Sequence, residues 1–439
     1  MHSPKDFLLL ECDGVKRVLH ETLRYDYGGD GSRDFFEECE IRLDFIRNEI
    51  EQTDVADHLA LQNGGSLLIE LSHLISRIER SSLDEYSWPF VEELKEIALA
   101  ICTEATIKDP HTPPKVHVLS DGGLDKYAIY AEPKRPSAGQ RRILTIIFPR
   151  SLKHFVLLHP VLGHELGHAI WRGSEHEKTI RELIQNNLLS NAKFQSSDAL
   201  AAWLYSANAP DEVKRTLNIL EANRGITQDD FFGGFADASA WVEEIACDLI
   251  GLATFGPSFV SSLSELLYGL MPSGGGFGPV HPPNGCRANM MLQAITLLGY
   301  DQLILPSQTA QDLHREFWGQ LHGQRQSNPW FDLFTDEELN RTLQAIRELL
   351  QQHPPSAYDS PRPEILSALV DELANQIPPN NFSLSDTGVP SFSKIDFRHI
   401  LYAGWVAAQD ATVTTFADMN RLCEHAIMQQ RAIKHYTGG

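Results

Sequence analysis

The 439-residue sequence has few cysteines and no long apolar run. Its six cysteines are dispersed and no two are spaced as C-x-x-C, which argues against a disulfide framework and against a cysteine zinc knuckle. The longest apolar stretches, such as residues 143–148, are far shorter than the ~20 residues that span a bilayer. The apolar run at residues 7–10 is too short for a signal peptide. We therefore expect a cytoplasmic protein in a reducing compartment, without a membrane partner.

Positive charge is also scarce. Lysine and arginine together number 37 against 59 aspartates and glutamates, which gives a formal net charge of -22. Nucleic acids and anionic membranes attract proteins that present a positive face. We expect no nucleic-acid partner, and solubility is the simplest explanation of the acidic excess.

A chain of this length is expected to form two or three domains. Apolar residues recur at helical spacing at both ends of the chain, which predicts an N-terminal helical domain at 1–110 and a C-terminal one at 301–439. The middle, 111–300, is predicted to form the functional core, with a helical insertion at 174–236. The expected fold class is α+β, predominantly α.

Short apolar segments in the middle of the chain predict strands at 115–119, 127–131 and 143–148, forming a small antiparallel sheet. Glycines in the N-terminal region are interpreted as turns, and the proline- and serine-rich stretches at 353–363 and 378–393 as connectors. The glycines concerned are Gly28, Gly29, Gly31, Gly64 and Gly65.

The most informative stretch is V-L-G-H-E-L-G-H-A-I-W at residues 161–171. It contains the H-E-x-x-H pattern of zinc hydrolases, with His164 and His168 on one face of a predicted helix. Its other residues are mostly apolar, so the helix is expected to be buried, where unsatisfied polar groups are costly. A metal ion would satisfy both imidazoles, and Glu165 would then act as the general base.

A second predicted helix contains W-V-E-E-I-A-C-D, in which Glu244 and Asp248 share a face. A catalytic zinc held by two histidines needs a third protein ligand and leaves a fourth position for water. Glu244 is the candidate ligand, and Asp248 is expected to accept a hydrogen bond from a ligand histidine. The alternative is that these acids, with Glu243, form a solvated face. The apolar residues around them argue against it.

H-E-L-G-H followed much later by E-x-x-x-D resembles the gluzincin metallopeptidases. The arrangement is most similar to the branch that contains the CAAX prenyl endopeptidases and the bacterial heat-shock membrane proteases. The segments I-L-T-I-I-F-P-R-S-L and H-P-P-N-G-C-R, which ends at Arg287, also resemble elements of that branch. The resemblance covers about residues 113–295 and implies a zincin-like metalloprotease core.

This resemblance implies one Zn²⁺ per chain, held by His164, His168 and Glu244. A donor at His281 or Arg287 is expected to stabilise the negative charge that develops on the substrate oxygen. An edge strand before the metal helix is expected to bind an extended substrate. The residues of this strand are Tyr127, Ala128, Ile129, Tyr130 and Ala131.

We therefore expect a zinc-dependent endopeptidase that acts on proteins or peptides. The G-x-M-E-N element of gluzincin aminopeptidases is absent from the sequence, which favours the endopeptidase mode. The flanking helical regions predict restricted access to the site and a regulatory protein partner. The alternative is a non-catalytic interaction or regulatory protein whose metal site is vestigial or structural.

Overall fold

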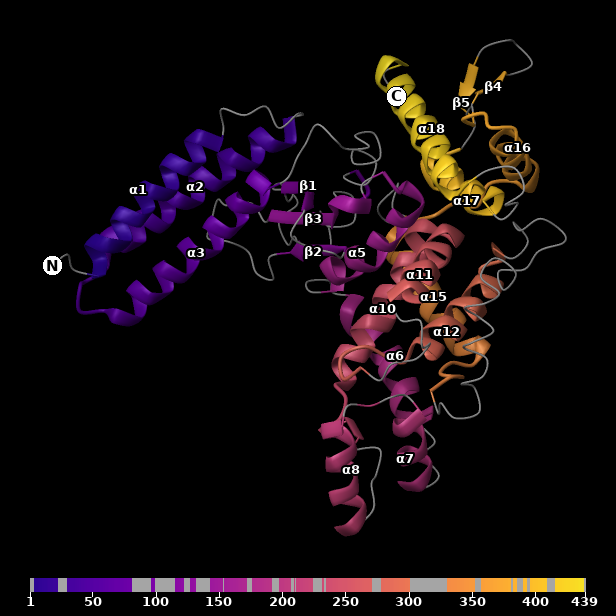
Figure 1. The fold of residues 1–439 in the computed structure, drawn as a ribbon, viewed down its shortest axis with the longest axis horizontal. Helices are drawn as coiled ribbons and strands as arrows, with labels where there is room; N and C mark the ends of the chain where they lie inside the picture. The colour runs from indigo at the N-terminus through magenta and orange to yellow at the C-terminus, as the bar shows by residue number, and fades with distance from the viewer. Residues whose placement is uncertain are drawn as a thin grey trace. The chain divides into compact units, whose positions relative to one another are not determined.

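Helices dominate the computed structural model (Figure 1). None of the described helices combines the length and the apolar character that a bilayer crossing requires. The structure describes residues 4–22, 30–80, 96–98, 115–121, 127–131, 143–152, 154–171, 176–191, 197–206, 209, 211–223, 231–232, 234–270, 278–300, 330–351, 357–379, 382–384, 390–392, 395–408 and 415–437.

The chain divides into two compact units, which we describe separately. Unit 1 comprises Met1–Ser87 and Ile107–Lys153, and unit 2 comprises Trp88–Thr106 and His154–Gly439. The three domains expected from the sequence stay a prediction, because compactness alone does not show which segments fold independently.

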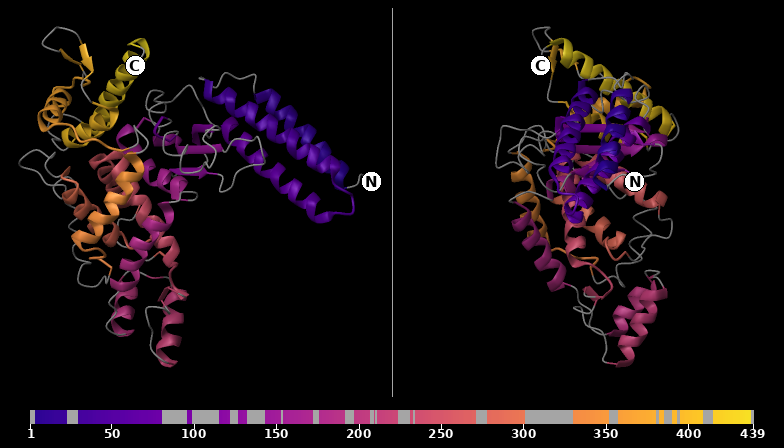
Figure 2. Two further views of the ribbon diagram at one scale, coloured as in Figure 1. Left: turned by 180° about the vertical axis from the view of Figure 1, so that it is seen from behind. Right: turned by 90° about the vertical axis from the view of Figure 1, so that its left-hand side faces the viewer.

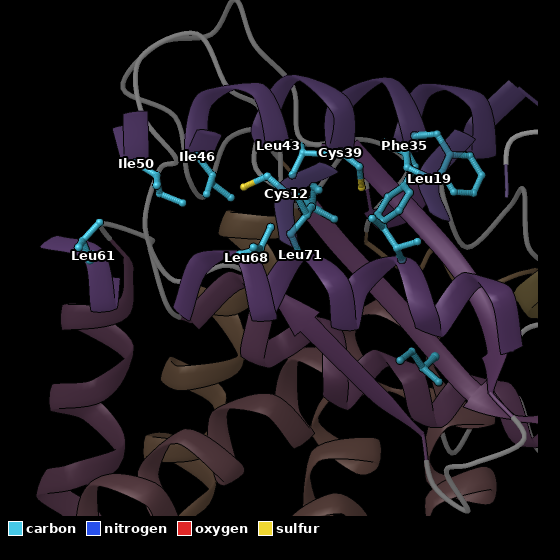
Figure 3. Packing of buried hydrophobic residues seen from close by; sticks show 14 residues of the cluster. Cys12, Leu19, Phe35, Cys39, Leu43, Ile46, Ile50, Leu61, Leu68 and Leu71 are labelled. Atoms are coloured by element: carbon cyan, nitrogen blue, oxygen red, sulfur yellow. The ribbon is translucent and has the colours of Figure 1, made fainter. Parts of the chain in front are cut away.

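Three long helices form most of the described part of unit 1: α1 (Pro4–Thr22), α2 (Asp30–Gln52) and α3 (His58–Arg80). They lie side by side (Figure 2, left) and bury one apolar cluster between them (Figure 3). Ile143 and Ile147 join the same cluster. The helical spacing of apolar residues thus predicts these helices correctly.

Three of the glycines interpreted as turns lie inside helices, so that interpretation is wrong for them. Gly31 lies in the first turn of α2, and Gly64 and Gly65 lie within α3. A Cβ atom at Gly64 would come within 2.9 Å of Ile50 on α2, and one at Gly65 within 3.3 Å of Leu8 on α1. The last two glycines therefore serve close packing between helices.

The sheet of unit 1 has the strand order β1-β3-β2, with β1 at Lys115–Asp121, β2 at Ala128–Ala131 and β3 at Ile143–Pro149. β2 pairs antiparallel with β3, as expected, whereas β1 pairs with β3 in parallel. The sheet is therefore mixed, not antiparallel throughout. A parallel pair depends on a long crossover that local sequence patterns do not reveal.

Unit 2 contains the metal helix α5 (Leu162–Trp171), which follows the 3-10 helix η3 (Val156–Val161). The stretch predicted as a helical insertion contains α6 (His176–Asn191), α7 (Ser197–Ser206) and α8 (Asp211–Asn223), so it is helical as expected, and its role as an insertion stays a prediction. Beyond it lie α10 (Ala238–Phe255), α11 (Pro257–Leu270), α12 (Asn284–Leu297), α15 (Asp336–Gln351), α16 (Pro363–Ala374), α17 (Phe397–Ala407) and α18 (Phe416–Thr437).

The C-terminal part departs from expectation at one point. The stretch 378–393, interpreted as a connector, contains the antiparallel pair β4 (Phe382–Leu384) and β5 (Pro390–Phe392). Strands of three residues are too short to show a periodic pattern in the sequence. Residues 301–329 of the expected C-terminal helical domain lie outside the described residues.

The contact between α5 and α10 determines the geometry of the site, and glycines allow it to be close. A Cβ atom at Gly167 would lie 2.6 Å from the Cα atom of Cys247, and one at Gly163 would lie 2.9 Å from the Cα atom of Gly251. The earlier glycine of α5 therefore faces the later residue of α10 and the later glycine faces the earlier one, so the two helices run antiparallel. Because backbone faces backbone here, side chains on the adjoining faces meet at short range.

Both ends of α10 are fixed by local signals. The side chain of Asp237 caps the start and accepts hydrogen bonds from the backbone amides of Ser239 and Ala240, at 2.8 and 3.1 Å. Gly256 ends the helix with φ at 62°, a left-handed conformation that glycine adopts without strain.

We expect Gly167→Ala to lower the free energy of unfolding of unit 2 by about 1–3 kcal/mol, since the added methyl group would overlap the backbone of α10. All seven tryptophans lie in unit 2, so tryptophan fluorescence during urea unfolding reports on this unit. Gly234→Ala is the matched control, because a Cβ atom there has nothing within 4 Å. Equal stability of the two variants would contradict the close helix contact.

Candidate metal centre

Two helices bring His164, His168 and Glu244 together. The Nε2 atom of His164 lies 3.3 Å from Oε2 of Glu244, and Nε2 of His168 lies 3.4 Å from Oε1. One ligand atom from each of the three residues lies within 4.8 Å of the other two. Glu244 is 5% exposed and His164 is 8% exposed, so the cluster is largely shielded from water.

The spacing of these atoms suits a tetrahedral ion. Two donors each about 2.0–2.1 Å from such an ion lie roughly 3.3–3.4 Å apart. Both nitrogen-to-oxygen distances in the cluster agree with this value. Two imidazoles and one carboxylate also form a donor set that zinc favours.

The carboxylate of Glu244 gives a second indication of a cation. Its Oε2 atom is buried, and among the described residues no hydrogen bond reaches it. It nevertheless lies 3.3 Å from Nε2 of His164 and 3.5 Å from Nε2 of His281. A buried carboxylate oxygen without a donor is costly, and a metal ion bound by Glu244 together with His164 and His168 would satisfy it.

On the side of each imidazole that faces away from Glu244, the ring nitrogen Nδ1 contacts another carboxylate. Nδ1 of His164 lies 2.8 Å from Oδ1 of Asp248, and Nδ1 of His168 lies 2.7 Å from Oε1 of Glu243. Since an ionised carboxylate only accepts hydrogen bonds, each Nδ1 carries the proton. In the neutral form of each ring, Nε2 then keeps the lone pair that a metal requires, and a metal ion would take the place of the second proton.

Asp248 was predicted in this role, whereas Glu243 was missed. Glu243 could have been predicted only from the relative direction of the two helices. Because α5 and α10 run antiparallel, a residue five positions before Asp248 lies near His168. The sequence alone does not give that direction.

Arg287, on α12, is placed against Asp248 and not toward the open side of the cluster. Its Nε and Nη2 atoms donate to the two carboxylate oxygens of Asp248, both at 2.7 Å. Asp248 is 0% exposed and Arg287 is 5% exposed, so each charge needs the other. This geometry favours a positioning role for Arg287, and it leaves His281 as the candidate donor to substrate.

The electrostatics of the cluster favour a positive charge. Burial lowers the pKa of His164, but the hydrogen bond with Asp248 and the nearby carboxylate of Glu244 outweigh it and raise the pKa to about 10. For His168 burial is likewise outweighed, by the hydrogen bond with Glu243 and the nearby carboxylate of Glu244, and the pKa rises to about 9. Burial raises the pKa of the Glu244 carboxyl, yet the two histidines hold it well below its usual range. The carboxylates thus attract either protons or a metal ion to this place.

The remaining predicted residues fall in two places. Glu165 is half-buried on α5, next to the ligand His164. Tyr127 precedes β2, which holds an edge position in the described sheet, as predicted. This strand belongs to unit 1, however, so its place beside the metal centre stays a prediction.

Comparisons of the chain with protein-family models, with curated proteins and with solved structures find no match. The geometry of the described residues therefore supports the functional proposal by itself, and the resemblance to gluzincins stays a hypothesis.

We expect the purified protein to bind about one zinc ion per chain, because the cluster offers three ligands and an open position. His164→Ala and Glu244→Gln each remove a ligand, and zinc affinity should fall on the order of 100-fold or more, beyond the loss typical of an outer hydrogen-bond partner. Competition with a chromophoric chelator measures this. His154→Ala, at an exposed histidine near Glu424, is the control. Full zinc affinity in both ligand variants would rule out the site.

The two outer carboxylates should differ in their effects. Glu243→Gln keeps an acceptor for His168 and should weaken zinc binding by roughly 10-fold, with little loss of stability. Asp248→Asn should weaken zinc binding in the same way. It also leaves Arg287 buried without its counter-charge, so the free energy of unfolding should fall by about 3–5 kcal/mol. Zinc titration and urea unfolding of the two variants test this. Equal loss of stability in both would contradict the buried pairing with Arg287.

Proposed function

We propose that the protein is a zinc-dependent endopeptidase of the gluzincin type. The observation that carries the proposal is the convergence of His164, His168 and Glu244, with each imidazole held through Nδ1 by a carboxylate. A cluster that served only as a structural zinc site would need a fourth protein ligand. Among the described residues, only these three group as ligands.

When bound, zinc would supply the Lewis acidity that lowers the pKa of a water molecule and polarises a peptide carbonyl. His164, His168 and Glu244 would hold it. The residues around them then determine how a proton moves during hydrolysis.

Glu165 acts as the general base. Its carboxylate takes one proton from the attacking water as the oxygen of that water bonds to the carbonyl carbon. The same carboxyl group then gives the proton to the amide nitrogen, the C–N bond breaks, and the products are a carboxylic acid and an amine. One carboxylate therefore serves both halves of the reaction.

His281 is the proposed donor to the carbonyl oxygen. Its side chain is 59% exposed while its Nε2 atom lies 3.5 Å from Glu244, so it reaches both solvent and the ligand cluster. A donor aimed at the negative charge that develops on the carbonyl oxygen contributes on the order of 3 kcal/mol. Although most of the side chain is exposed, the part of the ring that lies beside the cluster is desolvated, and this lowers the pKa of His281.

Extended protein or peptide segments are the proposed substrates, with residues 127–131 as the strand that binds them. Main-chain hydrogen bonds to an edge strand suit a substrate of varied side chains. We further propose that access to the site is restricted and that a protein partner regulates it.

Glu165→Gln should retain zinc and lose at least 100-fold in peptidase activity, because the change removes the base and no ligand. Cleavage of a peptide library by zinc-loaded wild type, by Glu165→Gln and by Glu212→Gln, an exposed control on α8, measures this. Undiminished activity of Glu165→Gln would exclude Glu165 as the base. A wild-type protein that binds zinc tightly but cleaves no peptide, with or without cell extract, would favour the non-catalytic alternative.

A further inference from the structure

A short segment before α12 holds His281, and it contains neither helix nor strand. We call residues Gly278–Pro283, with the sequence G-P-V-H-P-P, the His281 strap. A segment of this kind lacks the regular backbone hydrogen bonds that fix a side chain in a helix or sheet. Its position relative to Glu244 therefore depends on specific attachments.

The attachments come from one face of α10. Asp237 caps the start of α10, and Trp241, Glu244 and Asp248 follow within the helix at spacings of four, three and four residues. At about 100° per residue these three helical positions fall within roughly 60° of one another around the helix axis. They form a stripe along α10.

The strap and the start of α12 contact this stripe at both of its ends. The backbone amide of Asp237 donates to the carbonyl of Pro279 at 2.8 Å, and Nε1 of Trp241 donates to the carbonyl of Gly278 at 3.3 Å. Beyond the strap, Arg287 binds Asp248. His281 thus lies between two attachments to the helix that provides Glu244.

Trp241 can hold the strap because its own ring is fixed. It is 0% exposed and packs against other aromatic rings in unit 2. The ring centroids lie 5.8 Å from Phe231, 5.5 Å from Phe232 and 5.1 Å from Trp330. An indole packed in this way has little freedom to follow a moving carbonyl, so its N–H fixes the carbonyl of Gly278.

We propose that Trp241 is a positioning residue that, through the His281 strap, sets the place of His281 relative to the ligand Glu244. The inference deepens the proposed function and rests on it for its catalytic consequence. The strap itself can be tested without any activity.

Hydrogen exchange of the metal-free full-length protein gives that first test. Trp241→Phe keeps an aromatic ring and removes only the N–H donor, so the strap should detach more often, and the amide of Asp237, which donates to the carbonyl of Pro279, should exchange at least 3-fold faster. Trp203→Phe is the matched control, because Trp203 packs in the same aromatic cluster, 5.1 Å from Trp330, but lies on α7. Unchanged exchange in Trp241→Phe, or equal acceleration in Trp203→Phe, would overturn the proposal.

Kinetics give the second test. In Trp241→Phe, kcat should fall roughly 3- to 10-fold, the range expected for one hydrogen bond, while zinc affinity stays at the wild-type value. In the His281→Ala background the same substitution should change kcat less than 2-fold, since there is no imidazole left to position. A merely structural role would lower kcat by the same factor in both backgrounds, and that result would overturn the proposal.

Gly278→Ala changes the strap itself and leaves the aromatic residues around Trp241 unchanged. A Cβ atom there would lie 3.2 Å from the backbone oxygen of His281, so it should displace His281 and lower kcat to a similar degree. Unchanged kcat would count against the strap. If no variant or wild type cleaves peptides while Trp241→Phe still accelerates exchange, the proposed function fails and the attachment of the strap stands.

Discussion

The close approach of α5 and α10 is the constraint on which the candidate metal centre depends. Glycine on α5 meets Cys247 and Gly251 on α10 at distances that leave no room for a Cβ atom. The histidines and the acidic residues lie on the faces beside this contact, so each carboxylate reaches its imidazole directly. A wider helix spacing would move Glu244 away from both histidines at once, and the cluster would lose its ligand geometry.

Asp248 links this helix contact to a third helix. Asp248 lies on α10, and its buried carboxylate accepts hydrogen bonds from His164 of α5 and from Arg287 of α12. Arginine pairs with both oxygens in a fixed fork, which is why it suits a buried carboxylate better than lysine does. The orientation of one ligand histidine is thereby tied to the packing of three helices.

The sequence predicts which residues come together at the candidate site better than the contacts that hold them. His164, His168 and Glu244 can be inferred as candidate ligands because H-E-x-x-H and E-x-x-x-D each place two groups on one helical face. Glu243 and the pairing of Arg287 depend on the direction in which separate helices run, which no local pattern contains. In the fold, apolar periodicity predicts the helices, whereas the parallel pairing of β1 with β3 is a long-range property. Gly64 and Gly65 look like turn signals locally and turn out to serve helix packing.

The stripe along α10 has a consequence for how this protein can change during evolution. Asp237 and Asp248 are 248 − 237 = 11 residues apart, about three helical turns. One inserted or deleted residue between them would rotate everything beyond it by about 100° around the helix axis, so the carboxylate of Asp248 would no longer reach His164 while the cap stays in place. We therefore expect the length of this interval to be under stronger selection than most of the side chains within it. Loops elsewhere in unit 2 can lengthen without that penalty.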